Sequence, residues 1–130
     1  IWKGKLVVKG VMSQDDALKI KDEGADASQV SNHGGRQLES ATSAINALPL
    51  IRKALGPEFP LIFDSGIRSG GDIVRALAFC ADYVMIGRPL MYAIGADGAQ
   101  GLRKIIEIIK EELSTTLGLV GLTDINEITS

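Results

Sequence analysis

The chain is poor in several features that mark particular classes of protein. Its single cysteine, Cys80, excludes an internal disulfide framework and any metal site built from several cysteines. Aromatic residues make up only 5% of the chain and the net charge is −2, so neither base stacking nor a basic nucleic-acid surface is expected. No apolar run approaches the roughly 20 residues of a membrane span. We therefore expect a soluble, cytoplasmic chain with a buried Cys80 and with no metal or nucleic acid as a partner.

The residues that are present suit one packed domain. Of the 130 residues, 45% are hydrophobic and 23% are charged, which is an ordinary composition for a globular chain. Residues 1–130 are therefore expected to form a single unit around one core. Because the sequence opens with Ile1 rather than methionine, we expect it to be a segment of a longer protein.

Short β-branched apolar runs alternate with segments of helical periodicity. Strands are predicted at residues 5–9, 26–31, 61–64 and 83–86, and helices at 13–24, 43–55, 72–79 and 98–117, with a short helix at 123–127. Alternating strands and helices predict an α/β fold with a parallel sheet and right-handed crossovers. The strands are continuous apolar runs, so both faces of the sheet should be covered. Four such units suit a small open doubly wound sheet or half of an eightfold barrel.

Each predicted strand ends in glycine beside a polar or charged residue. In a parallel sheet all carboxyl ends of the strands lie on one face, where barrel active sites are built. These residues should therefore converge, and the only histidine of the chain is among them. The four endings are Lys9-Gly10, His33-Gly34, Asp64-Ser65-Gly66 and Gly87-Arg88.

The last two endings indicate an anion site. Backbone amides near Gly66 and Gly87 can approach a phosphate closely, and Arg68 and Arg88 can add charge-assisted hydrogen bonds. No G-x-G-x-x-G follows the first strand and no G-K-[ST] occurs, so dinucleotide-binding and P-loop motifs are excluded. The pattern predicts a phosphorylated ligand without naming it.

The segment Val-Ser-Asn-His-Gly-Gly-Arg-Gln-Leu, residues 30–38, resembles the signature of the FMN-dependent α-hydroxy acid dehydrogenases. This family includes glycolate oxidase, L-lactate dehydrogenase, mandelate dehydrogenase and flavocytochrome b2. Lys9-Gly10 and residues 64–68, 87–89 and 121–128 resemble further family segments in the same order. The resemblance implies strands five to eight of a (β/α)8 barrel, which is its C-terminal half, and FMN as the cofactor.

The resemblance also implies roles for individual residues. His33 would be the general base, and imidazole suits this role because it is largely neutral near pH 7. Arg36 would bind the substrate carboxylate with its planar guanidinium. Lys9 would lie at the N1–C2 edge of the flavin, where a cation favours reduction. Ser31 would be a further flavin contact.

The remaining predicted flavin contacts lie at the exits of the last two strands. Asp64 would bind the ribityl hydroxyl groups. The residues of the two phosphate segments would be Ser65, Gly66, Ile67, Arg68, Gly87 and Arg88.

The implied reaction is the FMN-dependent oxidation of an L-2-hydroxy acid, such as lactate or glycolate, to the 2-oxo acid. The implied partners are this substrate, an electron acceptor (oxygen, quinone or cytochrome) and the missing N-terminal half of the barrel. The parent is expected to be a homo-oligomer, with peripheral membrane association as one option. Two alternatives stay open. One is another phosphate-binding barrel, such as a type 2 isopentenyl isomerase or inosine monophosphate dehydrogenase, and the other is a non-catalytic half-barrel.

A few positions depart from the family pattern or carry no predicted role. Ser28 stands where an apolar residue is usual, so the second strand is expected to be less buried than in relatives. Cys80 replaces a common glycine. Arg52 and Arg103 lie in helical segments and are expected to be ordinary surface charges.

Overall fold

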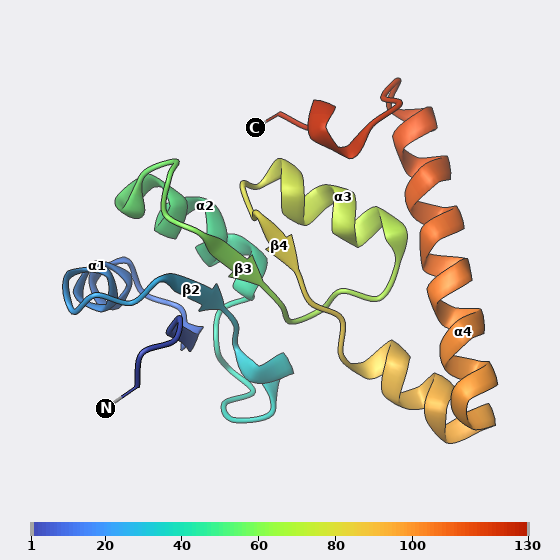
Figure 1. The fold of residues 1–130 in the computed structure, drawn as a ribbon, viewed down its shortest axis with the longest axis horizontal. Helices are drawn as coiled ribbons and strands as arrows, with labels where there is room; N and C mark the ends of the chain where they lie inside the picture. The colour runs from blue at the N-terminus through green and yellow to red at the C-terminus, as the bar shows by residue number, and fades with distance from the viewer. Residues whose placement is uncertain (1, 130) are drawn as a thin grey trace.

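The computed structural model describes residues 2–129 and has a four-stranded parallel sheet in the order β1-β2-β3-β4 (Figure 1). Each strand is followed by a helix, as the sequence predicts. The strands are β1 (Val7–Val11), β2 (Ala27–Val30), β3 (Leu61–Phe63) and β4 (Tyr83–Val84). The helices are α1 (Gln14–Asp22), α2 (Ala44–Leu55), α3 (Gly70–Ala78) and α4 (Arg88–Leu119), with 3₁₀ turns η1 (His33–Gly35) and η2 (Ile125–Glu127).

Several boundaries differ from the sequence prediction, and two of the differences have a clear structural cause. Strand β1 does not stop at Gly10: it continues to Val11 through a bulge, and Gly10 has a φ of 96°, which glycine adopts readily. Helix α4 begins at Arg88 rather than at Gly98. The predicted start is instead a kink within α4, where Asp97 and Gly98 leave helical geometry.

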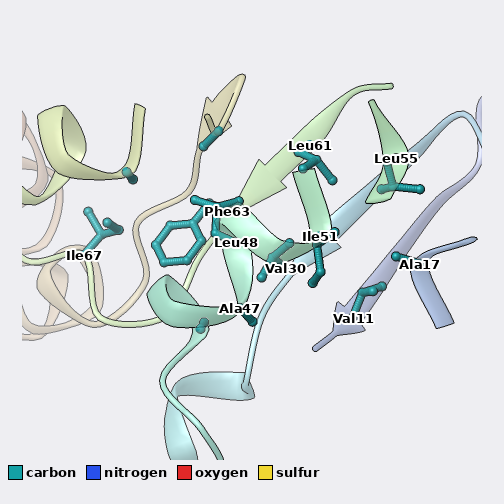
Figure 2. Close-up of a cluster of buried hydrophobic side chains, with 13 residues drawn as sticks. Val11, Ala17, Val30, Ala47, Leu48, Ile51, Leu55, Leu61, Phe63 and Ile67 are labelled. Atoms are coloured by element: carbon teal, nitrogen blue, oxygen red, sulfur yellow. The ribbon is translucent and has the colours of Figure 1, made fainter. Parts of the chain in front are cut away.

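The core lies between the sheet and helix α2, and Figure 2 shows its buried side chains. Phe63 on β3 packs with Leu48 of α2, and Val30 on β2 lies beside Ile51. Burying a side chain of this size stabilises a fold by about 1.5–3 kcal/mol. The core therefore stabilises strands β2 and β3 in particular, and the segments that follow these two strands carry His33 and Asp64.

The expectation that the second strand is less buried than usual is wrong. All four residues of β2 are buried, and Ser28 has no exposed surface. Its hydroxyl is the one buried side-chain oxygen or nitrogen within residues 2–129 that has no hydrogen-bond partner. An unpaired buried hydroxyl costs about 1–3 kcal/mol. Strand β2 lies between β1 and β3, so its burial is set by its place in the sheet and not by the polarity of Ser28.

The turns that lead from α1 to β2 and from α3 to β4 share one geometry. Gly24 and Cys80 occupy equivalent positions after the two helices, with φ values of 86° and 71°. Glycine suits this left-handed conformation because it has no Cβ, which explains why glycine would be the favoured residue at position 80. Cys80 is partly exposed there, so the expectation of a buried side chain is also wrong.

An aspartate completes each of these turns. The carboxylate of Asp26 accepts a hydrogen bond from the backbone amide of Leu6 at 2.8 Å, and Asp82 accepts one from the amide of Leu61 at 2.7 Å. The two aspartates thus hold the beginnings of neighbouring strands side by side. The segments Gly24-Ala25-Asp26 and Cys80-Ala81-Asp82 thus have similar sequences and form the same kind of turn.

Arg52 is a structural residue and not an ordinary surface charge. Its side chain is only 11% exposed and pairs with Asp82 at 2.6 Å. The guanidinium also donates to the backbone carbonyls of Gly56, Phe59 and Cys80 at 2.7–3.0 Å. It therefore joins the end of α2 to the turn before β4, using a planar set of donors that only arginine provides.

Replacing Arg52 should destabilise the fold. We expect Arg52→Met to lower the free energy of unfolding by about 3 kcal/mol, because several carbonyls and Asp82 lose their donor in a partly buried setting. The matched change is Arg103→Met, at an exposed position of α4, which should shift it by less than about 0.5 kcal/mol. Urea denaturation measures both, and equal effects of the two substitutions would contradict the structural role.

Candidate functional site

A cavity of about 640 Å³ lies at the carboxyl end of the sheet. The segments that follow β2, β3 and β4 all lie on this side of the molecule (Figure 1). The predicted site residues that line the cavity are Lys9, His33, Arg36, Asp64, Ser65, Gly66, Ile67, Arg68, Gly87 and Arg88. His33 therefore shares one cavity with both glycine-containing anion segments. Lining residues without a predicted role are Gln29, Gly34, Gln37, Met85, Ile86 and Met91.

The cavity is strongly cationic although the whole chain has a net charge of −2. Lys9, Arg36, Arg68 and Arg88 line it, against the single carboxylate of Asp64. Within residues 2–129 none of the three arginines forms an ion pair. Guanidinium groups without a carboxylate partner around a hollow favour the binding of an anion.

The part of the cavity near β3 and β4 can accept a bulky anion. A Cβ atom built on Gly66 or Gly87 would meet no atom within 4 Å, so space lies open directly beside the backbone. Gly66 also has a φ of 99°, a conformation that suits glycine. A guanidinium nitrogen of Arg88 lies 3.5 Å from the position that a Cβ on Gly34 would take. The segment that follows β4 and carries Arg88 thus reaches the turn that carries His33.

The turn that carries His33 is tightly shaped. His33 has a φ of 57°, an uncommon conformation for a residue with a side chain, and the side chain of Asn32 accepts a hydrogen bond from the amide of Gly35 at 3.2 Å. The imidazole packs against Gly10, where an added Cβ would come within 2.8 Å of His33 Cε1. The bulge of β1 and the absence of a side chain at Gly10 therefore make room for the ring.

Two serine hydroxyls accept hydrogen bonds from the backbone of this turn. Ser31 is fully buried and does not line the cavity; its Oγ accepts from Lys9 Nζ at 2.8 Å and from the amide of His33 at 3.1 Å. Ser65 Oγ accepts from the amides of Asn32 and Gly34 and donates to Asp64 at 2.8 Å. Because both hydroxyls are engaged within the chain, a direct flavin contact by either one would require it to give up a partner.

Asp64 is the centre of a polar cluster on the floor of the cavity. It forms an ion pair with Lys9, and it accepts hydrogen bonds from Gln29 at 2.7 Å and from Ser65. Partial burial alone would raise the pKa of Asp64, but the hydrogen bonds from Lys9 and the serines, together with the charge of Lys9, lower it overall. The carboxylate is therefore held in its charged form.

Gln29 was missed by the sequence prediction. Its signal was a polar side chain within a strand expected to be buried, the same signal that singled out Ser28. The two differ in the face of the sheet that they occupy, which the pattern of β2 does not reveal because all its residues are buried.

The described residues offer no metal site and no membrane span. Within residues 2–129 there is no group of three or more histidine, cysteine, aspartate or glutamate side chains that could hold a metal ion. No described helix is long and apolar enough to cross a bilayer.

Comparison with known proteins agrees with this geometry. The sequence model of the FMN-dependent dehydrogenase family matches residues 1–130. The chain belongs to this family. It is 43% identical over 127 residues to an L-lactate dehydrogenase of Pseudomonas syringae pv. syringae (strain B728a) and 44% identical over 127 residues to one of Caulobacter vibrioides (strain NA1000 / CB15N). These matches cover 98% of the chain and 33% of each relative, so the chain spans about a third of their length.

Solved structures give the same result for the fold. The chain superposes on crystal structures of mandelate oxidase, alone and with (S)-4-hydroxymandelic acid, with a TM-score of 0.90 and 39% identity. The superposition covers 96% of this chain and 36% and 35% of those chains. The predicted fold class is confirmed: the four strand–helix units form part of a (β/α)8 barrel.

The cavity of this family member fits FMN. The phosphate needs an open, cationic cradle, which Gly66, Gly87, Arg68 and Arg88 would supply. The polyol chain needs hydrogen-bonding groups deeper in the site, and Asp64 lies there. The cofactor predicted from the sequence therefore suits both the family and the residues of this chain.

The lowered pKa of Asp64 predicts an acid-sensitive fold. Because the folded-state pKa lies below the unfolded-state pKa, the ionised carboxylate contributes stability at neutral pH, and this contribution is lost as the pH falls through the folded-state value. We expect the free energy of unfolding to fall below about pH 4, and to fall less in Asp64→Asn.

Urea unfolding at a series of pH values measures this effect. The control is Asp22→Asn, at an exposed position outside the cavity, which should keep the acid dependence of the parent chain. The same acid dependence in Asp64→Asn as in the parent chain would contradict the prediction.

Proposed function

We propose that the complete protein oxidises an L-2-hydroxy acid of the lactate or glycolate type to the 2-oxo acid, with FMN as the cofactor. The observation that carries this proposal is a single cavity that joins an anion cradle to His33 and Arg36. Relatives named L-lactate dehydrogenase and mandelate oxidase support the substrate class. The family match also favours this function over an isomerase or a nucleotide dehydrogenase built on another phosphate-binding barrel.

Arg36 would orient the substrate. Arg36 lines the cavity and forms no ion pair within the described chain, so its N–H donors are available for a carboxylate. A two-pronged contact would fix the carboxylate and direct the neighbouring hydroxyl-bearing carbon toward His33.

His33 would take up a proton from the substrate. Oxidation of the alcohol removes two electrons and two protons, and one of these protons would pass to the imidazole. When bound, FMN supplies the acceptor for the two electrons and for the second proton. The packing of the ring on Gly10 and the hydrogen bond from the His33 amide to Ser31 would keep the base in one position.

Lys9 would supply a fixed positive charge on the floor of the cavity. It is held there by Asp64 and Ser31, so its ammonium has a defined position before any ligand binds. A preorganised cation beside the isoalloxazine ring would favour the reduced, anionic form of the cofactor.

We further propose that the chain acts as the C-terminal half of a closed barrel. Within residues 2–129, β1 and β4 each have one unpaired edge, and Val7 and Tyr83 on these strands are 42% and 66% exposed. The N-terminal half would pair with both edges and add the remaining contacts to flavin and substrate. We also propose that the complete protein is a cytoplasmic homo-oligomer, with peripheral attachment to a membrane as one option. Its electron acceptor would be oxygen, a quinone or a cytochrome.

The chain alone should be a poor enzyme. We expect the 130-residue chain to bind FMN at least about 100-fold more weakly than the complete protein, because half of the barrel contacts are absent. Flavin fluorescence titration measures the affinity, and anaerobic bleaching with lactate or glycolate measures turnover. Ready turnover by the chain alone would refute the half-barrel proposal.

His33→Gln in the complete protein tests the role of the base. Reduction of bound FMN by the hydroxy acid should slow by about 10²–10⁴-fold, the usual contribution of a general base, while the FMN affinity stays the same. Stopped-flow absorbance under anaerobic conditions measures the rate, with Arg103→Lys as an exposed control. Unchanged flavin reduction in His33→Gln would exclude the proposed mechanism.

A further inference from the structure

Gln29 has an unusual setting for a glutamine. It is 6% exposed, it lies on the central strand β2, and it lines the cationic cavity. A buried amide is costly unless it is hydrogen-bonded, so its presence on the cavity floor calls for a partner.

The sheet register directs Gln29 into the cavity. Lys9 on β1 and Gln29 on β2 are paired residues, so their side chains project from the same face of the sheet. Both side chains reach the same carboxylate oxygen of Asp64, from Lys9 Nζ and, at 2.7 Å, from Gln29 Nε2. Its neighbour Ser28 points to the opposite face, where its register partner Leu61 belongs to the hydrophobic core.

The hydrogen bond to Asp64 uses only part of the amide. A glutamine side chain has two N–H donors and one oxygen acceptor, and one N–H is engaged. The Oε1 atom accepts no hydrogen bond from the described residues. It is not shielded from solvent either, because within residues 2–129 Ser28 Oγ is the one buried side-chain oxygen or nitrogen without a hydrogen-bond partner. The unused acceptor therefore faces accessible space in the cavity.

We propose that Gln29 is a further ligand of FMN and binds hydroxyl groups of its polyol chain together with Asp64. This inference rests on the FMN-dependent function proposed above. An amide beside a carboxylate offers both an acceptor and a donor, and this combination matches an alcohol, which donates and accepts through one oxygen. Arg68 and Arg88 would bind the phosphate.

The test separates the polyol from the phosphate in the complete protein. Gln29→Met keeps the length of the side chain and removes its hydrogen bonds. We expect it to weaken FMN and riboflavin by about fivefold each, the effect of one neutral hydrogen bond, and to leave the affinity for inorganic phosphate unchanged. Arg88→Met should instead weaken FMN and inorganic phosphate and spare riboflavin.

The matched control is Ser28→Ala, which removes a hydroxyl from the adjacent residue on the other face of β2 and should leave all three affinities unchanged. Thermal denaturation of each variant checks that it is folded. If Gln29→Met does not fold, Gln29→Glu serves the same purpose, because it loses both N–H donors and places a second negative charge beside Asp64; weaker riboflavin binding is expected there too.

Three results would overturn the proposal. Wild-type affinity for riboflavin in a folded Gln29 variant would show that the amide does not contact the ligand. An equal loss of affinity for lumiflavin, which lacks the polyol chain, would place the contact on the ring. If the wild-type protein does not bind FMN at all, the proposed function is itself wrong. This result is seen with the wild-type protein alone, before any variant is compared.

Discussion

The site depends on the hydrogen bonds between the exit of β3 and the turn after β2. Ser65, with a φ of 81°, takes up a left-handed conformation that costs a residue with a side chain of the order of 1 kcal/mol. Its hydroxyl then accepts from the amides of Asn32 and Gly34 and donates to Asp64. These bonds connect the carboxylate on the cavity floor to the backbone on both sides of His33. The position of the proposed base is thus set by a neighbouring strand as well as by its own.

Polar groups on the two faces of the sheet have opposite consequences. On the cavity face, Lys9 and Gln29 both donate to Asp64, and the pKa of Asp64 is lowered although burial opposes this. On the helix face, Ser28 has no partner and weakens the core. A cluster that is preorganised in this way needs little rearrangement when an anionic cofactor binds, and this fits the membership of the chain in an FMN-dependent family.

Much of the fold and of the site could be predicted from the printed residues. The alternation of apolar runs with helical segments predicted every strand and helix, and the glycines after the strands predicted which residues meet in the cavity. Apart from element boundaries, such as the start of α4, the predictions that proved wrong concern burial. Arg52 is held by the distant turn of Cys80 and Asp82, β2 is buried despite Ser28, and Cys80 is partly exposed. Burial is set by neighbours that are remote in sequence, so local composition is a poor guide to it.

The sequence by itself determined the order of the elements and the chemistry at each strand end, because strand period, helix caps and glycine turns are properties of adjacent residues. Only the tertiary structure decided which side chains share a partner. Gln29 and Asp64 are 35 positions apart and meet because the register of β2 against β1 turns Gln29 toward the cavity. A register shifted by one residue would direct Ser28 there instead, since successive side chains of a strand point to opposite faces. That choice is made by the packing of the sheet on α2, which no local pattern contains.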